Sequence, residues 1–355
     1  MEYGAIDLHK NESQIRIVTE DGELVDRRIA TTRDHLTAVF AKRPLMRILV
    51  ESSTESEWVA QHLETFGHEV IVADPNYAPM YGHRTRRVKT DLRDVAALAD
   101  ACMHGIYRAV HRRSERQRTV QQQLNVRDAL VQTRTRAISL ARATTRANGF
   151  RLRSGTSETF VRRVEELGLP PAVATALAPL CHVIDVVSEE LDAADARLAA
   201  ATKTDPAVRR LMTLPGIGPI TATAFIAALD DAGRFRRPGQ VASYLGLVPC
   251  EYSSGEKRRR GRVMRSAHPR VQALLVQAGW RVWRSRRPET EPLRRWTRSI
   301  ADRRGKKVAV VALARRLARI LFGMWRDETD FAAERVGAGR VRQRAATPGP
   351  NAKVA

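Results

Sequence analysis

The chain has 355 residues, enough for two or three domains with their own cores, and a formal net charge of +22. Its three cysteines, Cys102, Cys181 and Cys250, are far apart and form no CxxC pair, which argues against a zinc site or a disulfide framework and fits a reducing cytoplasm. The N-terminus lacks the apolar core of a signal peptide, and arginines interrupt the longest apolar region, Val308–Phe322, so no membrane span is predicted.

The charge is divided unevenly along the chain. Residues 1–100 carry 13 Lys and Arg against 17 Asp and Glu, whereas residues 101–155 carry 12 against 2. Residues 156–205 are acidic again, with 4 against 9, and residues 206–355 hold 32 against 11. If the chain were basic only because all proteins of its organism are basic, the charge would not be divided between segments in this way. The pattern favours basic modules that grip a polyanion and deliver it to an acidic module.

The first hundred residues predict an α/β module. Strands are expected at Glu2–Asp7, Gln14–Thr19, Glu23–Ala30, Met46–Glu51 and Glu69–Ala73, and helices at Arg33–Lys42, Glu55–Phe66 and within Arg86–Ala101. Three antiparallel strands followed by alternating helix and strand give the ribonuclease-H-like order.

Four carboxylates are expected to converge at one end of this sheet. Asp7 and Glu51 end two apolar strands, where a charged acid is costly unless it is paired or binds a metal. Asp91 and Asp94 stand three residues apart in a first helical turn and share one face. Four oxygen ligands favour Mg²⁺ or Mn²⁺ and phosphodiester chemistry. The alternative for Asp91 and Asp94 is helix capping or a solvated surface.

A long helical segment is predicted next. Ile106–Arg153 is nearly free of Gly and Pro, and Leu124, Val131 and Ile138 recur at seven-residue spacing. After a break near Ser154–Thr156, a second apolar seam is formed by Ile184, Val187, Leu191, Ala194, Leu198 and Ala201. The two helices are expected to pair, within one chain or between chains.

The first of these helices is basic and the second is acidic. The arginines of the first helix either form a solvated face, partly matched by the acids of the second helix, or offer a surface that binds phosphates. They are Arg112, Arg113, Arg116, Arg118, Arg127, Arg134, Arg136, Arg142 and Arg146.

The stretch Leu211–Leu229, LMTLPGIGPITATAFIAAL, is typical of a helix-hairpin-helix. Gly216 and Gly218 would let backbone N–H groups approach a phosphate at the start of the second helix without reading sequence. Alternatively, the glycines only make the turn of an ordinary helical hairpin.

Two serines precede a basic run in Leu247–Val263, LVPCEYSSGEKRRRGRV. Ser253 or Ser254, beside a glycine and fixed cations, could attack a phosphate, although such a stretch is also typical of a flexible loop near nucleic acid. The candidate phosphate contacts are Lys257, Arg258, Arg259, Arg260 and Arg262. Amphipathic helices are expected at Pro269–Arg284 and Lys306–Trp325, and a disordered tail at Gly337–Ala355.

Several stretches together resemble the DEDD transposases of bacterial insertion sequences, which include bridge-RNA-guided recombinases and Piv-type DNA invertases. They are IDLHK, RVKTDLRDVAALA, LPGIGPITA, SYLGLVP and YSSGEKRRRGRV, and the likeness covers roughly residues 1–330. It implies a RuvC-like domain over 1–105, a helical coiled-coil linker over 106–205, a transposase domain with a serine loop over 206–330, and a basic tail over 331–355.

The resemblance also implies a chemistry. The acidic tetrad falls on Asp7, Glu51, Asp91 and Asp94, which would hold Mg²⁺ or Mn²⁺, with Glu51 as a ligand or as an aid in removing the serine proton. Ser254, with Ser253 as the alternate, would attack a DNA phosphate and form a phosphoserine link. The implied partners are DNA, a structured noncoding bridge RNA and further copies of the chain in a dimer or tetramer. Two other classes remain open: a metal-only nuclease resembling Holliday-junction resolvases, and a non-enzymatic nucleic-acid-binding protein.

Overall fold

The computed structural model describes residues 1–82, 90–254, 257–263 and 268–334 and divides into two compact units, Met1–Arg113 and Ser114–Ala355. The first unit combines a mixed sheet with helices, and the second is mainly helical, which confirms the predicted α/β plus α class. The finer boundaries at 105, 205 and 330 remain predictions.

The first unit is built on a five-stranded sheet with the strand order β3-β2-β1-β4-β5. β1 pairs antiparallel with β2, and β2 with β3, whereas β1, β4 and β5 are parallel neighbours. The strands are β1 (Glu2–Leu8), β2 (Glu12–Val18), β3 (Leu24–Ala30), β4 (Met46–Glu51) and β5 (Glu69–Ala73). All five predicted strands are confirmed, with small shifts at their ends.

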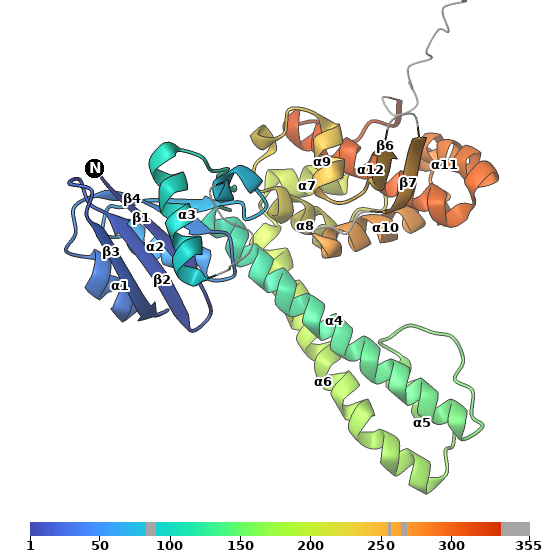
Figure 1. Ribbon diagram of the computed structural model, residues 1–355. Helices are drawn as coiled ribbons and strands as arrows, with labels where there is room; N and C mark the ends of the chain where they lie inside the picture. The colour runs from blue at the N-terminus through green and yellow to red at the C-terminus, as the bar shows by residue number, and fades with distance from the viewer. Residues whose placement is uncertain (83–89, 255–256, 264–267, 335–355) are drawn as a thin grey trace, which may run out of the picture. The chain divides into compact units, whose positions relative to one another are not determined.

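Helices cover both faces of this sheet (Figure 1). α1 (Arg33–Phe40) and α2 (Ser56–Glu64) pack on the face that includes Ile6 and Ile48. α3 (Asp91–His104) packs on the face that includes Ala5 and Leu49. Because side chains alternate along a strand, the residues two positions after Ala5 and Leu49 also lie on the side of α3. Those residues are Asp7 and Glu51.

The predicted long helix beginning at Ile106 is wrong in its first part. The chain between α3 and α4 runs extended beside β5, where Ala109 bridges Ala73 and the Val110 N–H donates to the Val72 carbonyl. Arg112 in this segment binds Glu57 and Glu64 on α2. The edge of a sheet offers backbone partners that helix propensity cannot foresee, and α4 starts only at Glu115.

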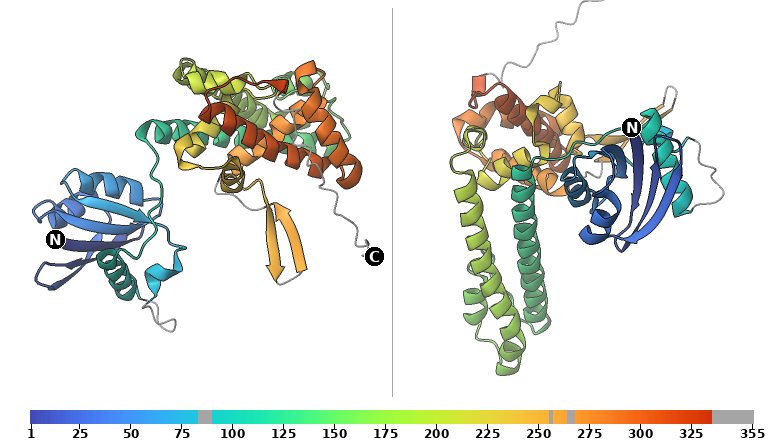
Figure 2. Two further views of the ribbon diagram at one scale, coloured as in Figure 1. Left: turned by 90° about the horizontal axis from the view of Figure 1, so that it is seen from above. Right: turned by 90° about the vertical axis from the view of Figure 1, so that its left-hand side faces the viewer.

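The second unit begins with two long antiparallel helices, α4 (Glu115–Ala147) and α6 (Pro171–Thr202), with the short α5 (Phe160–Glu165) at their far end (Figures 1 and 2). They pair within one chain. The predicted seam of α6 is buried from Ile184 to Leu198, but Ala201 is exposed and Thr202 takes the buried place. Part of the basic charge of α4 is matched as expected, since Arg127 pairs with Asp195.

Within the described ranges, α6 alone has the length and hydropathy of a candidate membrane span. The sequence prediction, which named Val308–Phe322 as the longest apolar region, overlooked it. The buried residues of α6 pack against the polar helix α4 of the same chain.

The remainder of the second unit is a helical body around one core. Leu124 of α4 and Leu198 of α6 join this core, which attaches the helix pair to the body. Its helices are α7 (Pro206–Met212), α8 (Pro219–Leu229), α9 (Pro238–Tyr244), α10 (Pro269–Arg284), α11 (Glu291–Arg304) and α12 (Lys306–Arg326). The predicted helices at Pro269–Arg284 and Lys306–Trp325 are confirmed, and α11 was missed.

The predicted serine loop is instead part of a hairpin. β6 (Pro249–Ser254) pairs antiparallel with β7 (Lys257–Val263), as Figure 2 shows. Only two residues separate the strands, and a two-residue connection beginning with glycine is a strong hairpin signal. The predicted tail lies outside the described residues.

Candidate metal centre

Two of the candidate acids end neighbouring parallel strands at the same level. Ile6 of β1 is in register with Val50 of β4, so the next residues, Asp7 and Glu51, lie side by side at the carboxyl edge of the sheet. Both are on the face covered by α3, as the burial of Ala5 and Leu49 requires. The local sequence produces this pair because each apolar run ends one residue before its acid.

The other two acids lie in the first turn of α3. Thr90 caps the helix by accepting a hydrogen bond from the Arg93 N–H. Asp94 is buried toward the sheet, whereas Asp91, three residues earlier, is exposed. The partly positive end of the helix favours each carboxylate by only about 0.3–1 kcal/mol.

The pKa of Asp7 responds to the other three acids. Burial raises the pKa of the Asp7 carboxyl, the nearby His9 lowers it, and the carboxylates of Glu51, Asp94 and Asp91 raise it further. A carboxylate surrounded by others holds its charge more readily when a cation is bound among them.

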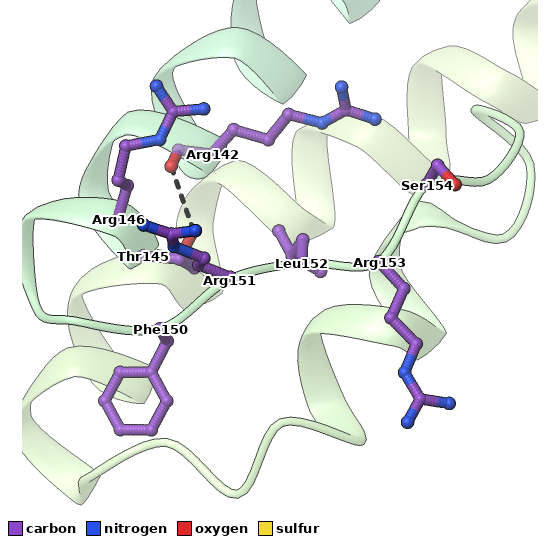
Figure 3. A pocket seen from close by; sticks show the side chains of 8 residues that line it. All are labelled: Arg142, Thr145, Arg146, Phe150, Arg151, Leu152, Arg153 and Ser154. Atoms are coloured by element: carbon purple, nitrogen blue, oxygen red, sulfur yellow. Dashed lines mark hydrogen bonds between the residues drawn. The ribbon is translucent and has the colours of Figure 1, made fainter.

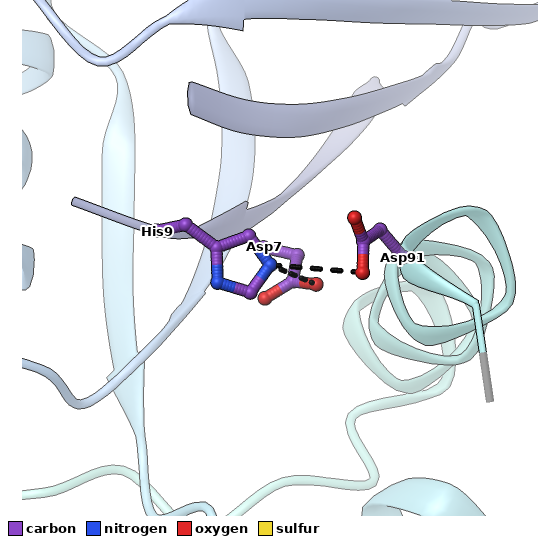
Figure 4. A group of neighbouring side chains, drawn as sticks. All are labelled: Asp7, His9 and Asp91. Carbon is purple, nitrogen blue, oxygen red and sulfur yellow. Dashed lines mark ion pairs between the residues drawn. The ribbon is translucent and has the colours of Figure 1, made fainter. Parts of the chain in front are cut away.

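His9 joins this group, although the sequence prediction did not include it. Its Nε2 lies 3.5 Å from Asp7 Oδ2 and 3.7 Å from Asp91 Oδ1 (Figure 4). One ligand atom from each of Asp7, His9 and Asp91 falls within 4.8 Å of the other two. His9 follows directly after β1, which ends at Leu8, so the stretch IDLHK alone gave no strong signal for it.

The donor set fits a hard divalent ion. Asp7 and Asp91 offer carboxylate oxygens, the ligands that Mg²⁺ prefers, and His9 adds an imidazole nitrogen that Mn²⁺ also accepts. Glu51 and Asp94 are not part of this closest group, but their carboxylates are near enough to raise the pKa of Asp7. Glu51 additionally accepts a hydrogen bond from the Tyr81 hydroxyl, which fixes the orientation of that carboxylate. Hydrogen bonds that orient carboxylates in this way are also found around metal sites.

The serine and the basic run lie in the other unit. Ser253 and Ser254 are the last residues of β6, in register with Arg258 and Lys257 of β7. The candidate phosphate contacts Lys257, Arg258, Arg259, Arg260 and Arg262 therefore all belong to one strand.

The two glycines of the predicted helix-hairpin-helix differ from each other. α7 and α8 form a helical hairpin, and Gly218 stands immediately before α8 with open space where a side chain would be. Gly216 has a φ of +95°, and an added Cβ would lie 3.0 Å from the Val282 side chain. Gly216 is thus required by packing, whereas Gly218 leaves room for a ligand near the start of α8.

Comparisons with known proteins agree with this arrangement. A DEDD-type transposase family model matches residues 5–145, and the model of the transposase IS116/IS110/IS902 family matches residues 208–293. Together they match more than half of the chain, including the four acids but not the stretch 146–207.

Relatives that align over nearly their whole length are also named as transposases. The chain is 29% identical to a Pseudomonas aeruginosa protein named "Probable family 20 transposase", covering 92% of this chain and 97% of that protein. It is 28% identical to the transposase for insertion sequence element IS1328 of Yersinia enterocolitica, again over 92% and 97%. It is 25% identical to the transposase for IS1111A of Coxiella burnetii, over 91% and 90%. The chain therefore belongs to the IS110/IS116/IS902 family of transposases.

Proposed function

We propose that this transposase cuts and rejoins DNA strands with a divalent metal held by Asp7, Glu51, Asp91 and Asp94, and with Ser254 as the nucleophile. The observation that carries the proposal is the meeting of these acids where β1, β4 and α3 come together. Mg²⁺ bound there would polarise a DNA phosphate and offset its developing charge.

The roles of the chain's own residues follow from their places. Asp7 and Asp94 are buried and held by regular structure, which suits them to fix the position of an ion. Asp91 and His9 are exposed, so they would be accessible to a DNA substrate. The serine hydroxyl would attack phosphorus, expel the deoxyribose oxygen and conserve the bond energy in a phosphoserine link.

A suicide DNA substrate tests the serine step. The wild-type protein should form a covalent protein–DNA adduct that survives denaturation and maps to Ser254. Ser254→Ala should lose the adduct, and Asp7→Asn should lose it too because the metal must activate the phosphate. Ser253→Ala, the matched neighbour, should retain it; an adduct on Ser253 would correct the register by one residue.

Sharing of the site between copies is part of the proposal. The acids lie in the first unit and the serine in the second. If two copies exchange these parts in a dimer or tetramer, mixing Ser254→Ala with Asp7→Asn protein should restore some recombination. Recombination by the wild type, with no adduct and no rescue, would overturn the serine mechanism.

A metal-only nuclease is the second candidate, because all four acids lie in the first unit and could bind an ion without the serine. In that case Ser254→Ala would still cut DNA with water as the nucleophile. An architectural nucleic-acid-binding protein would need neither group, and Asp7→Asn would leave all its activities unchanged.

Guidance by a structured noncoding RNA belongs to the same proposal and is supported by the resemblance and the basic charge of the chain. Copurification of one RNA, encoded beside the gene, with the wild-type protein tests it. Only nonspecific RNA, with recombination unaffected by ribonuclease, would argue against a guide.

A further inference from the structure

The far end of the α4–α6 pair holds a hollow that the proposed chemistry does not use. It has a volume of about 540 Å³. It is lined by Arg142, Thr145, Arg146, Phe150, Arg151, Leu152, Arg153 and Ser154, and we call it the arginine pocket. Figure 3 shows Arg146 and Arg151 close together at one end, while Arg153 extends from the other. The family models leave most of this segment unmatched.

The backbone of the arginine pocket is held in place by specific contacts. At the end of α4, the Gly149 N–H donates to the Arg146 carbonyl and the Phe150 N–H to the Thr145 carbonyl. With Gly149 at a φ of +84°, these bonds form a Schellman motif, which directs the chain back across the end of the helix. The segment that carries Arg151 and Arg153 therefore leaves α4 in a defined direction.

Arg163 fixes the far side of the same loop. Its guanidinium donates to the carbonyls of Arg153 at 2.5 Å, Thr156 at 2.6 Å and Thr159 at 3.1 Å. Gly155 leaves space for this contact, because an added Cβ would lie 2.7 Å from the Arg163 side chain. The loop is thus preformed, and Arg163 is used for its structure.

Among the residues that the structure describes, no acid pairs with the arginines that line the pocket. Residues 136–157 contain five arginines and no Asp or Glu. In the described part of the chain, no carboxylate forms an ion pair with Arg142, Arg146, Arg151 or Arg153. Two of the acids that follow in the sequence are engaged elsewhere, Glu158 with Arg134 at 3.7 Å and Glu166 with Arg162 at 3.5 Å.

We propose that the arginine pocket binds the phosphodiester backbone of a single-stranded nucleic acid segment. Guanidinium groups bind phosphate oxygens in paired hydrogen bonds, and several of them around one hollow fit successive phosphates. Phe150, half-buried at the rim, offers a face on which an unpaired base can stack. A hollow of this size admits nucleotides but not a duplex.

The pocket lies well away from the helical body of its own unit. From Leu124, which belongs to the core of that body, to Arg146 the helix rises by roughly 30 Å. If the helical body also binds nucleic acid, a single strand in the arginine pocket would be a second point of contact for the same molecule. The length of the α4–α6 pair would then set the distance between the two contact points.

The test compares two triple variants of the full-length protein. The pocket triple is Arg146→Gln, Arg151→Gln and Arg153→Gln; Arg142 is kept because its guanidinium lies over the Phe160 ring. The control triple removes three charges elsewhere on the exposed surface of the helix pair and the turn after it: Arg136→Gln, Arg197→Gln and Lys203→Gln. Thermal unfolding of both should match that of the wild type.

Binding of fluorescent dT20, rU20 and a 20-base-pair DNA is measured by anisotropy at several salt concentrations in EDTA. Because metal is absent, the result is independent of the acidic site and of the serine. The pocket triple should weaken single-strand binding by about tenfold or more and lower the salt slope by about 2, given roughly 0.7 per lost contact. The control triple should change both much less. A bromouracil-containing strand should cross-link within residues 142–154 of the wild type.

The three nucleic acids distinguish between RNA and DNA as the ligand, and some results would contradict the proposal. A larger loss for rU20 than for dT20 identifies RNA as the ligand, and equal losses identify the shared backbone. Equal weakening by both triples, or a loss confined to duplex DNA, would overturn the proposal. So would a change in sedimentation of the pocket triple with unchanged nucleic acid binding, which would assign the pocket to an acidic surface of a second copy.

Discussion

The acidic end of the first sheet and the arginine pocket both gather side chains of one sign, yet they are held very differently. Asp7 and Asp94 are buried and fixed by a strand and a capped helix, so their oxygens have defined positions. Arg146, Arg151 and Arg153 are exposed at the ends of long side chains. Rigid, buried acids suit one small cation in a strict geometry, whereas exposed guanidinium groups suit a flexible polyanion.

The comparison predicts all-or-none behaviour at the acids. Asp94→Asn or Asp91→Asn should lower strand cleavage on the order of 10³-fold, because a ligand and its charge are lost where the metal acts, while nucleic acid affinity stays nearly unchanged. Cleavage in Mg²⁺ and Mn²⁺ and calorimetric Mn²⁺ binding are the measurements. Asp100→Asn, an exposed acid on the same helix, is the control. Full cleavage by either variant would remove the metal assignment.

The basic strand β7 should respond by degrees. Replacing Arg258, Arg259, Arg260 and Arg262 with Gln should weaken DNA binding evenly across sequences and reduce the salt slope by about one unit per phosphate contact. The matched control is Arg295, Arg304, Lys306 and Lys307 to Gln, four exposed cations on α11 and α12. An unchanged slope in the β7 variant would mean that this strand is only a solvated surface.

Much of the acidic site could be predicted because it depends on local patterns. Apolar runs ending in Asp7 and Glu51 specify strands and faces, and Asp91 and Asp94 follow the helical period. The parallel register that sets Asp7 beside Glu51 follows from the strand order. His9 was missed because a histidine after a strand is ordinary until the fold brings Asp91 beside it.

The sequence-based predictions failed where contacts with distant segments determine the local structure. The segment 106–113 has helical composition but is captured by the edge of β5 and by the acids of α2. The arginine pocket depends on Arg163 binding loop carbonyls, which no periodicity reveals. The β6–β7 hairpin was missed for a different reason, because the two-residue connection between its strands could have been recognised in the sequence.

The two glycines of the α7–α8 hairpin separate packing from binding within one turn. Gly216→Ala forces a side chain into a positive φ and against Val282, so it should destabilise the protein by about 1–3 kcal/mol and lower the melting temperature. Gly218→Ala has open space and should leave the melting temperature nearly unchanged. If the start of α8 contacts phosphate, Gly218→Ala should still weaken DNA binding. Equal melting temperatures for both variants would contradict the packing assignment.

A matched pair of charges provides the opposite case and the smallest expected effect. Arg270 of α10 lies 2.9 Å from Asp128 of α4, and its hydrogen bond holds the pKa of that carboxyl below the ordinary value of 3.8. Since folding favours the ionised form, the stabilisation is present above the unfolded pKa and is lost as the pH falls through the folded pKa. The Asp128 side chain is 36% exposed, so solvent limits the gain to about 0.5–1 kcal/mol. Asp128→Asn should therefore lower the urea midpoint at pH 7 and leave it unchanged in acid, with the exposed Asp192→Asn as control. An equally lowered urea midpoint at both pH values would show that Asp128 acts by packing. The expected result would mean that paired charges such as Arg270 and Asp128 stabilise the fold, whereas charges without an ion pair are available to bind ligands.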